Sequence, residues 1–421
     1  MHTIADLHIH GRYSRACSKD LSVATLTHYA KQKGIHLLGT GDFTHPIWIQ
    51  ELNNNLVEND RGLLQTKQGY HFMWTTEISL VYTQDKGRRV HLVVFAPNGE
   101  VVQQITDYLK TKGRVDYDGR PIFNIPCPEF TEALKEIDES IEIIPAHAWT
   151  PWFSVFGSKS GFDSLKECFL DQTRHIYAIE TGLSSDPPMN WRIKELDDYN
   201  LVSFSDSHSY WPWRIGREAT IFDGDVNEMT YKKIIQGIRT KKGLLSTIEV
   251  DPSYGKYHID GHRACGIVFE PEETKKHNGI CPKCNRPLTL GVLGRVQELA
   301  DREEGYIPKN HIPYTKLLPL HEVISSVIGG AVTTKKVNSV YESLMKNHNE
   351  FQVLMNLPYE KLASLSTPTI AQAIVNVRQD KITIEAGYDG VYGKVHFEQQ
   401  KKDEPSAANK TDSSQKTLGG F

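Results

Sequence analysis

Short apolar segments alternate with polar segments over the first 245 residues. The apolar runs are rich in β-branched and aromatic residues, which is typical of strands, whereas stretches such as 21–34 and 131–140 are typical of helices. This alternation predicts a mainly parallel α/β sheet or barrel over residues 1–245. The clearest strand candidates are residues 35–42, 70–78, 89–97, 141–149, 175–183 and 201–208.

The pattern changes after residue 250. Residues 250–295 are rich in Gly, His and Cys, and residues 296–400 have a largely helical pattern interrupted by Pro and Gly. Residues 401–421 have the composition of a disordered tail. We therefore expect a barrel followed by a small metal-binding domain, a helical C-terminal domain and a tail.

Composition narrows the class of protein. The chain has 421 residues, 39% of them hydrophobic, and a net charge of −4, so any contact with DNA requires local basic patches. Neither a signal peptide nor an apolar run of membrane-spanning length is present, which indicates a cytoplasmic protein without a membrane partner. Six cysteines, scattered except for Cys281 and Cys284, suit a reducing compartment better than a disulfide framework.

Metal-competent side chains recur at the ends of the expected strands. His8 and His10 are two residues apart, so on a strand they project from the same face and can share one ion. In an α/β barrel, the carboxyl ends of different strands meet at one site. A mixed set of His and carboxylate ligands of this size could hold two or three divalent ions. The candidate ligands are His8, His10, Asp42, Glu77, His91, His147, Asp206 and His208.

A second metal site is indicated by cysteine spacing. Cys281 and Cys284 form a Cys-x2-Cys turn, and His262 and Cys265 have the same gap upstream, so four ligands could close a structural zinc site. His258 could replace His262, and two free thiols in a turn are the alternative to a zinc site.

The strand-end motifs resemble those of the polymerase and histidinol phosphatase (PHP) superfamily. The matching segments are "DLHIH", the strand-end Glu77, "VHL", "PAH" and "SDSH". The resemblance implies a distorted (β/α)7 barrel, a trinuclear metal site and phosphoesterase chemistry. The second motif departs from the family's Thr-Asp-His, because Phe43 stands at the histidine position, so either Asp42 or His45 would be the ligand there. Asp20 is the candidate for the acidic or His ligand expected after the first motif.

Further segments resemble the endonuclease Q family of DNA repair enzymes. They are residues 180–192, residues 387–395 and the Cys-containing segment, and the similarity extends to about residue 395. The resemblance implies cleavage of DNA on the 5′ side of deaminated bases (deoxyuridine, deoxyinosine or hypoxanthine, xanthine) and at abasic sites. The resemblance also implies that Glu77, Asp206 and His208 are the catalytic residues, with zinc, Mg²⁺ or Mn²⁺ in the active site.

Such an enzyme needs a pocket for a flipped base and a grip on phosphates. Aromatic residues crowd the strand ends, and Trp149, Trp152 and Trp213 are the pocket candidates, with core packing as the alternative role. The segment 325–344 predicts two helices joined at a Gly-Gly turn, which is either a phosphate-binding element or an ordinary helical hairpin. The candidate DNA-binding residues are Arg192, Arg214, Arg217, Lys335 and Lys336.

The expected function is thus a metal-dependent DNA repair endonuclease located with the nucleoid. A small-molecule phosphoesterase of the histidinol phosphatase kind is the alternative enzyme, although such an enzyme would not need the 150 residues after the barrel. A non-catalytic DNA- or protein-binding module is disfavoured, because the candidate ligands are retained. We expect the C-terminal tail to serve as a docking segment for a replication or repair factor.

Overall fold

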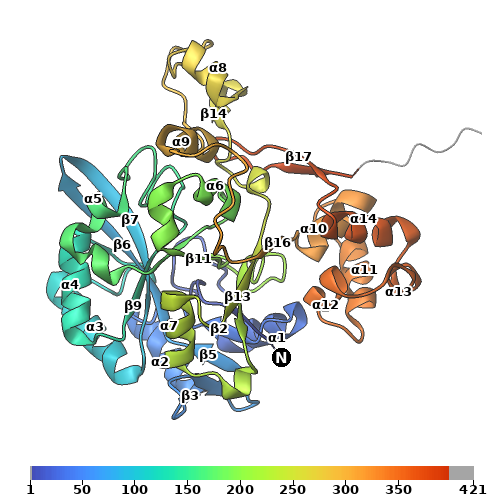
Figure 1. Cartoon of the computed structure of the whole chain (residues 1–421). Helices are drawn as coiled ribbons and strands as arrows, with labels where there is room; N and C mark the ends of the chain where they lie inside the picture. The colour runs from blue at the N-terminus through green and yellow to red at the C-terminus, as the bar shows by residue number, and fades with distance from the viewer. Residues whose placement is uncertain (1, 398–421) are drawn as a thin grey trace, which may run out of the picture.

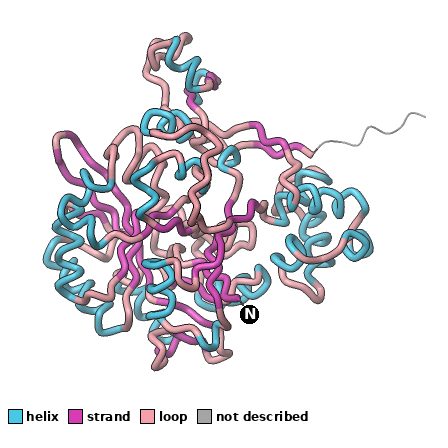
Figure 2. Tube along the Cα trace, in the orientation of Figure 1, coloured by secondary structure: helices cyan, strands magenta, loops and turns pink. Residues whose placement is uncertain are grey.

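The N-terminal part of the chain closes into a ring of strands. The computed structural model describes residues 2–397, so the expected tail at 401–421 lies outside the described residues. Figure 2 shows the strands in the middle of this part, with helices around them. The ring runs through β1 (His2–Asp6), β2 (Leu37–Gly39), the consecutive β5 (His71–Met73) and β6 (Thr75–Gln84), β7 (Lys86–Phe95), β9 (Glu142–Pro145), β10 (Ala178–Glu180) and β11 (Asn200–Val202).

Two backbone hydrogen bonds complete the ring where the short strands end. The N–H of Ala148 donates to the carbonyl oxygen of Glu180 at 2.9 Å, which joins the end of β9 to β10. The N–H of His10 donates to the carbonyl oxygen of Ser207 at 2.9 Å, which joins the continuation of β11 to that of β1. The loops after these strands therefore meet at one end of the ring.

The expectation of a mainly parallel sheet is wrong for part of the ring. β7 is antiparallel to both β6 and β9, because β6 and β7 form a long hairpin in which Gln84 pairs with Lys86. Asp85 at the tip has φ 61°, the left-handed conformation that such a tight turn requires. The predicted strands at 70–78 and 89–97 therefore belong to a continuous ribbon whose middle the apolar pattern does not reveal.

Further strands extend the sheets on either side of the ring. They are β3 (Leu56–Glu58), β4 (Leu64–Thr66), β8 (Ile122–Phe123), β12 (Ala219–Asp223), β13 (Leu244–Glu249) and β16 (Tyr314–Lys316). β12 is antiparallel to both β1 and β13, so this edge also departs from a parallel sheet.

Amphipathic helices cover the strands from outside (Figure 1). In α7 (Tyr231–Thr240), Thr230 caps the first turn by accepting from the N–H of Lys233, and Ile234 and Ile238 are buried among the strands. The other helices of this part are α1 (Val23–Lys33), α2 (Pro46–Asn55), α3 (Gly99–Lys112), α4 (Cys127–Ile137), α5 (Leu165–Phe169) and α6 (Pro187–Trp191). Short 3₁₀ turns occupy Leu170–His175, Lys194–Asp198, Val226–Glu228, Pro252–Tyr254 and Arg263–Cys265.

The segment after residue 250 projects from the ring, at the top of Figure 1. It has its own small apolar cluster of Phe269, Cys281 and Leu288. Its base is anchored to the ring, since the guanidinium of Arg295 donates to the carbonyl oxygens of Phe156 and Phe162. Its elements are β14 (Asp260–His262), β15 (Ile267–Phe269), α8 (Pro271–Lys276) and α9 (Val292–Leu299).

The remaining helices form a separate group beside α1. As the sequence predicts, a helix ends at a Gly-Gly turn: α10 stops at Ile328, and Gly329 and Gly330 have φ 76° and 95° before α11 begins. This group comprises α10 (Leu320–Ile328), α11 (Lys335–Met345), α12 (Glu350–Met355), α13 (Tyr359–Leu365) and α14 (Pro368–Arg378).

A final hairpin of β17 (Thr383–Glu385) and β18 (Lys394–His396) leaves the helices and packs against the segment that follows residue 250. Gly387 donates from its N–H to the carbonyl oxygen of Ser253 at 2.8 Å, so residues far apart in the sequence meet here. Among residues 2–397, no helix combines the length and the apolar composition needed to cross a membrane.

Candidate metal centre and active site

His8 and His10 are buried side by side inside the ring. They flank Ile9, which pairs with Ser207, so both imidazoles project to the same side and their ring centroids are 5.5 Å apart. The two histidines of "DLHIH" thus lie where the sequence predicts, although β1 itself ends at Asp6.

A first group of potential metal ligands gathers around these histidines. It consists of His8, His10, Glu77 and Asp206, whose ligand atoms all lie within 4.8 Å of one another. His10 Nε2 is 3.1 Å from Asp206 Oδ1 and 3.3 Å from Glu77 Oε2. His8 Nε2 is 3.6 Å from both Glu77 Oε1 and Asp206 Oδ1. These spacings are those of donors that converge on one point.

A second group shares Glu77 with the first. His91 Nδ1 and His147 Nε2 lie 2.8 Å and 3.1 Å from Glu77 Oε1. Glu77 therefore belongs to both sets of potential ligands, and its carboxylate could help to hold an ion in either set. A donor set of imidazoles and carboxylates suits zinc and other first-row divalent metals.

Electrostatics favour the ionised carboxylate at Glu77. Burial alone would raise the pKa of Glu77, but the facing His91, Arg120 and His8 hold it well below its usual range. The carboxylate is therefore charged at neutral pH and ready to bind cations.

His8 and His10 each have a carboxylate beside Nδ1, and this contact fixes the orientation of the ring. Asp42 Oδ1 is 3.0 Å from His10 Nδ1, and Glu180 Oε1 is 2.9 Å from His8 Nδ1, so both Nε2 atoms face the centre. Asp42 Oδ2 accepts from the N–H of Gly11 at 2.6 Å and from the hydroxyl of Ser14 at 2.7 Å. Asp42, expected as a metal ligand, is in neither group, because its oxygens are used to hold His10 and the loop after it.

His208 lies beside the first group and is a member of neither. Its ring centroid is 4.4 Å from that of His10, and its Nδ1 is 3.7 Å from Asp206 Oδ1. Burial and the neighbouring His10 lower the pKa of His208 to about 4, so its imidazole is neutral at pH 7. That His208 is a direct ligand stays a prediction, and the structure places its ring next to the first group.

The other two ligand candidates lie elsewhere. His45 caps α2 by accepting from the N–H of Trp48 at 3.4 Å, and its ring stacks on Tyr13 at 4.5 Å. Asp20 is an exposed residue of the turn before α1. Phe43, which stands at the family's histidine position, is fully buried against Trp74.

Three residues of the centre have left-handed backbone conformations. Asp42, His147 and Asp206 have φ of 47°, 30° and 46°, each shortly after a strand. Non-glycine residues adopt these values at a cost in energy, which is typical of functional sites. The chain therefore turns sharply at two members of the ligand groups, His147 and Asp206, and at Asp42, which holds His10.

A cavity of about 690 Å³ opens beside both groups. His147, Asp206 and His208 line it together with aromatic and cationic residues. Lys256 Nζ is 4.7 Å from the ring centroid of Tyr392, and the Arg214 guanidinium is 5.6 Å from it. The combination of flat apolar faces and cations suits an anionic, aromatic ligand. The wall residues are Trp152, Phe153, Arg214, Arg217, Lys256, Tyr257 and Tyr392.

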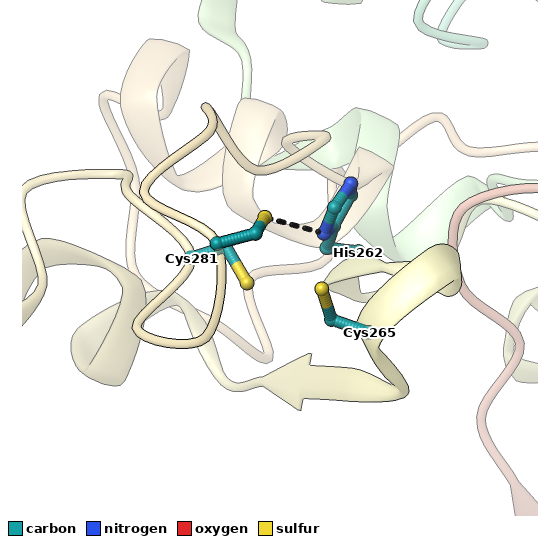
Figure 3. Close-up of side chains that lie close together, drawn as sticks. His262, Cys265 and Cys281 are labelled. Atoms are coloured by element: carbon teal, nitrogen blue, oxygen red, sulfur yellow. Dashed lines mark hydrogen bonds between the residues drawn. The ribbon is translucent and has the colours of Figure 1, made fainter.

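The projecting segment brings the predicted zinc ligands together. His262, Cys265, Cys281 and Cys284 have ligand atoms within 4.8 Å of one another, and the Cys284 Sγ is 3.4 Å from His262 Nδ1. Figure 3 shows His262, Cys265 and Cys281 turned toward one another. His258, the alternative to His262, is outside this group. Burial would raise the pKa of Cys281, but the N–H groups of Lys283 and Cys284 lower it to about 6, which favours a thiolate.

Comparison with known proteins gives the family. Residues 319–381 match the MJ0043 C-terminal domain. The crystal structure of the lesion-specific endonuclease PfuEndoQ from Pyrococcus furiosus superposes with a TM-score of 0.83 at 33% identity, covering 94% of this chain and 95% of that one. The chain belongs to the endonuclease Q family.

Other endonuclease Q structures and relatives agree. A complex of endonuclease Q with a 27-mer duplex that carries an abasic lesion at the active site gives a TM-score of 0.85 at 33% identity, over 94% of this chain and 96% of that one. The uncharacterized protein YqxK of Bacillus subtilis is 29% identical over 93% of this chain and 98% of its own length. The uncharacterized protein MJ0043 of Methanocaldococcus jannaschii is 38% identical over 297 residues. The matching region is 69% of this chain but only 35% of the length of MJ0043.

Two of the three tryptophans expected in the pocket of this endonuclease Q family member are core residues. Trp149 is 1% exposed, donates from Nε1 to Asn190 Oδ1 at 2.8 Å and packs on Phe156. Trp213 is buried between Trp211 and the helical group. The prediction of a pocket role is wrong for Trp149 and Trp213, because both rings are buried in the core. Trp152 does line the cavity.

Only some of the residues expected to bind DNA line the cavity. Arg214 and Arg217 line the cavity, whereas Arg192 does not, because its Nε donates to the carbonyl oxygen of Arg302 at 3.4 Å. Lys335 and Lys336 are exposed in the first turn of α11.

Sequence reasoning missed two residues of the centre, Glu180 and Arg120. Glu180 had a detectable signal, since it ends an apolar strand as the other candidates do. Arg120 lies in a loop without any such pattern, and its Nη1 is 2.8 Å from Glu77 Oε2.

Proposed function

We propose that the chain is a metal-dependent DNA repair endonuclease. The observation that carries the proposal is that Glu77 belongs to two ligand groups, and that His147 and Asp206 of these groups line a cavity with cationic and aromatic walls. The lesion-specific endonuclease and the complex with abasic DNA, both similar over nearly their whole length, support DNA as the substrate.

In this proposal the two groups hold divalent ions, either zinc or Mg²⁺ or Mn²⁺. The ions would supply an activated water and stabilise charge on the phosphate. Glu77 and Asp206 position them, while Glu180 and Asp42 keep the imidazoles of His8 and His10 aimed at the centre. His208 is neutral and next to Asp206, so it can accept or return a proton at the edge of the cavity.

The cavity is the proposed pocket for the lesion. A base flipped out of the duplex would stack on Trp152 or Tyr257, whose rings lie 5.8 Å apart. Arg214, Arg217 and Lys256 would contact adjacent phosphates. The preference we propose is the family's: cleavage 5′ of deoxyuridine, deoxyinosine and xanthine, and at abasic sites.

The parts of the chain then take separate roles. Residues 1–245 are proposed as the catalytic PHP barrel, 250–295 as a structural zinc domain and 296–400 as a helical region that contacts DNA through Lys335 and Lys336. The zinc assignment is supported by four converging ligands, which leave no open position. Such an enzyme would work at the nucleoid.

The deciding experiment uses matched end-labelled duplexes with one deoxyuridine, one abasic site or no lesion. They are incubated with the purified chain after EDTA treatment and after addition of Zn²⁺, Mg²⁺ or Mn²⁺. We expect a cut beside each lesion only when metal is present. The variant D206N should bind the duplex without cutting it. Hydrolysis of histidinol phosphate with no cleavage of any duplex would favour the small-molecule phosphoesterase instead.

A further inference from the structure

Arg120 reaches the metal-binding groups from the loop between α3 and β8. Its Nη1 lies 2.8 Å from Glu77 Oε2, and its side chain is 21% exposed whereas that of Glu77 is fully buried. Within residues 2–397 this is the one hydrogen bond that the guanidinium makes. A guanidinium has five N–H donors, so Arg120 keeps several of them free beside the centre.

The backbone next to Arg120 is fixed in place. A Cβ added to Gly119 would lie 2.4 Å from both Asp42 Oδ2 and Ser14 Oγ, so only glycine allows the loop to pass this close. Asp118 Oδ1 accepts from the N–H groups of Arg15 and Arg120 at 3.3 Å and 3.1 Å. The loop of Arg120 is therefore tied directly to the loop after His10.

The electrostatic surroundings keep the guanidinium where it is. The guanidinium contacts the carboxylate of Glu77, and the charges of Asp206 and Asp42 also attract it. With metal ions on the ligand groups, the charges of Glu77 and Asp206 would be neutralised by the ions. The charge of Arg120 would then be available for another anion.

We propose that Arg120 holds the scissile phosphate, by donating from its free N–H groups to a non-bridging oxygen while Glu77 keeps its position. The planar fork of a guanidinium matches two oxygens of a phosphate, and this geometry distinguishes Arg from Lys. Negative charge on those oxygens would be stabilised by donors that are already in place. The inference rests on the proposed function, since it names the residue that binds the reacting group.

The competing role for Arg120 is simple neutralisation of the buried carboxylates. The two roles predict different effects of the substitution R120Q. A phosphate-holding residue affects anion binding and rate while the metals remain, whereas a charge-balancing residue affects metal content first.

The test compares R120Q and R120K with R114Q. Arg114 is a control from the same loop, because its side chain is 73% exposed, pairs with Asp116 and lies over the ring of Tyr117, away from the ligand groups. Three quantities are measured: bound metal per chain, affinity of the metal-loaded protein for inorganic phosphate by calorimetry, and the single-turnover rate on the abasic duplex.

We expect R120Q to keep its metals, to bind phosphate at least about 10-fold more weakly and to cut about 10²–10³-fold more slowly, the usual effect of removing one donor to a developing oxyanion. R120K should recover part of the rate because it restores a single charge. Phosphate affinity and rate within threefold of R114Q, or a loss that parallels loss of metal, would overturn the inference. If the parent protein cuts none of the damaged duplexes but needs Arg120 to bind phosphate, the proposed function fails while the role of Arg120 stands.

Discussion

Both carboxylate oxygens of Glu180 face Nδ1 of His8, at 2.9 Å and 3.0 Å, and both side chains are buried. The pair fixes the imidazole with Nε2 toward Glu77 and Asp206. Glu180 Oε2 also accepts from the N–H of His147 at 2.7 Å, so one carboxylate orients a ligand from each of the two groups.

Removing the negative charge of Glu180 should weaken metal binding without leaving a cavity in the core. In Glu180→Gln the side chain keeps its size but the interaction with His8 loses its ionic part. We expect metal affinity to fall by about 10–100-fold, the range for partners behind metal-binding histidines. Metal titration monitored by calorimetry measures it. The exposed Glu129→Gln is the control, and equal affinities of the two variants would contradict the orienting role.

The metal centre is only partly predictable from local sequence patterns. Two histidines at i and i+2 form a local pattern, and residues at strand ends can be expected to meet, so most of the ligands can be predicted without the fold. A motif position assigns Asp42 to the metal, and only the fold shows its oxygens turned to His10 and Ser14. Arg120 depends on a contact with Glu77 across 43 residues of sequence, which no local pattern encodes.

The β6–β7 hairpin escapes prediction for a different reason. Its tip, residues 83–88, is polar and separates two apolar runs, so periodicity alone does not show that one turn joins the two strands. The buried alternation does continue past the predicted end of the first strand, to Leu80 and Tyr82. The order of the ring cannot be obtained from periodicity either, since a pattern of period two is the same in parallel and antiparallel strands.

Trp152 and Trp149 should have opposite consequences on substitution. Stacking of a base on an aromatic ring is worth about 1–3 kcal/mol, so Trp152→Ala should slow cleavage at deoxyuridine relative to an abasic site by roughly 5- to 150-fold. Trp149→Ala removes a buried core ring and should cost about 3–5 kcal/mol of stability with no change in that ratio. Rates on matched duplexes and urea unfolding measure the two effects. Equal loss on both lesions in the Trp152 variant would place the pocket elsewhere.

The cysteine group should be structural. The double variant Cys281→Ser with Cys284→Ser removes two of four converging ligands, so it should lose one zinc per chain and bind damaged DNA more weakly, while the ring stays folded. Elemental analysis and circular dichroism check these outcomes. Cys17→Ser, which changes a thiol outside the group, should keep its full zinc content. Unchanged zinc in the double variant would exclude this site.

His321 should make the stability of the protein depend on pH. Burial lowers the pKa of His321 to about 4, against an ordinary value of 6.5, so the fold contains the neutral ring. A depressed pKa contributes stability above pH 6.5 that is lost as the pH falls toward 4. Between pH 7 and pH 5 the loss should be about 2 kcal/mol. Urea unfolding at both values tests it, and His321→Gln should show a correspondingly smaller difference between the two pH values. An identical pH dependence in the variant would show that His321 is not responsible.

The buried ion pair of Lys33 and Glu350 should decide whether the helical group stays attached to the ring. Lys33 Nζ lies 2.6 Å from Glu350 Oε1, both side chains are at most 1% exposed, and the pair joins α1 to α12. Glu350 also accepts from the N–H of Leu320 at 2.9 Å and from the hydroxyl of Tyr341 at 3.0 Å, so it organises three helices of the group. Lys33→Met leaves a buried carboxylate without its cation, which should cost about 3–5 kcal/mol.

The neighbouring Lys31→Met is the matched control, because Lys31 is on the same last turn of α1 but exposed. Adding Glu350→Gln to Lys33→Met removes the buried, unpaired carboxylate and keeps an acceptor for the N–H of Leu320. The double variant should therefore be more stable than Lys33→Met alone. Urea unfolding gives the free energies, and limited proteolysis between α9 and α10 reports whether the helical group has detached. If Lys33→Met resists protease as well as Lys31→Met does, apolar packing between α1 and α12 holds the group in place and the ion pair is dispensable.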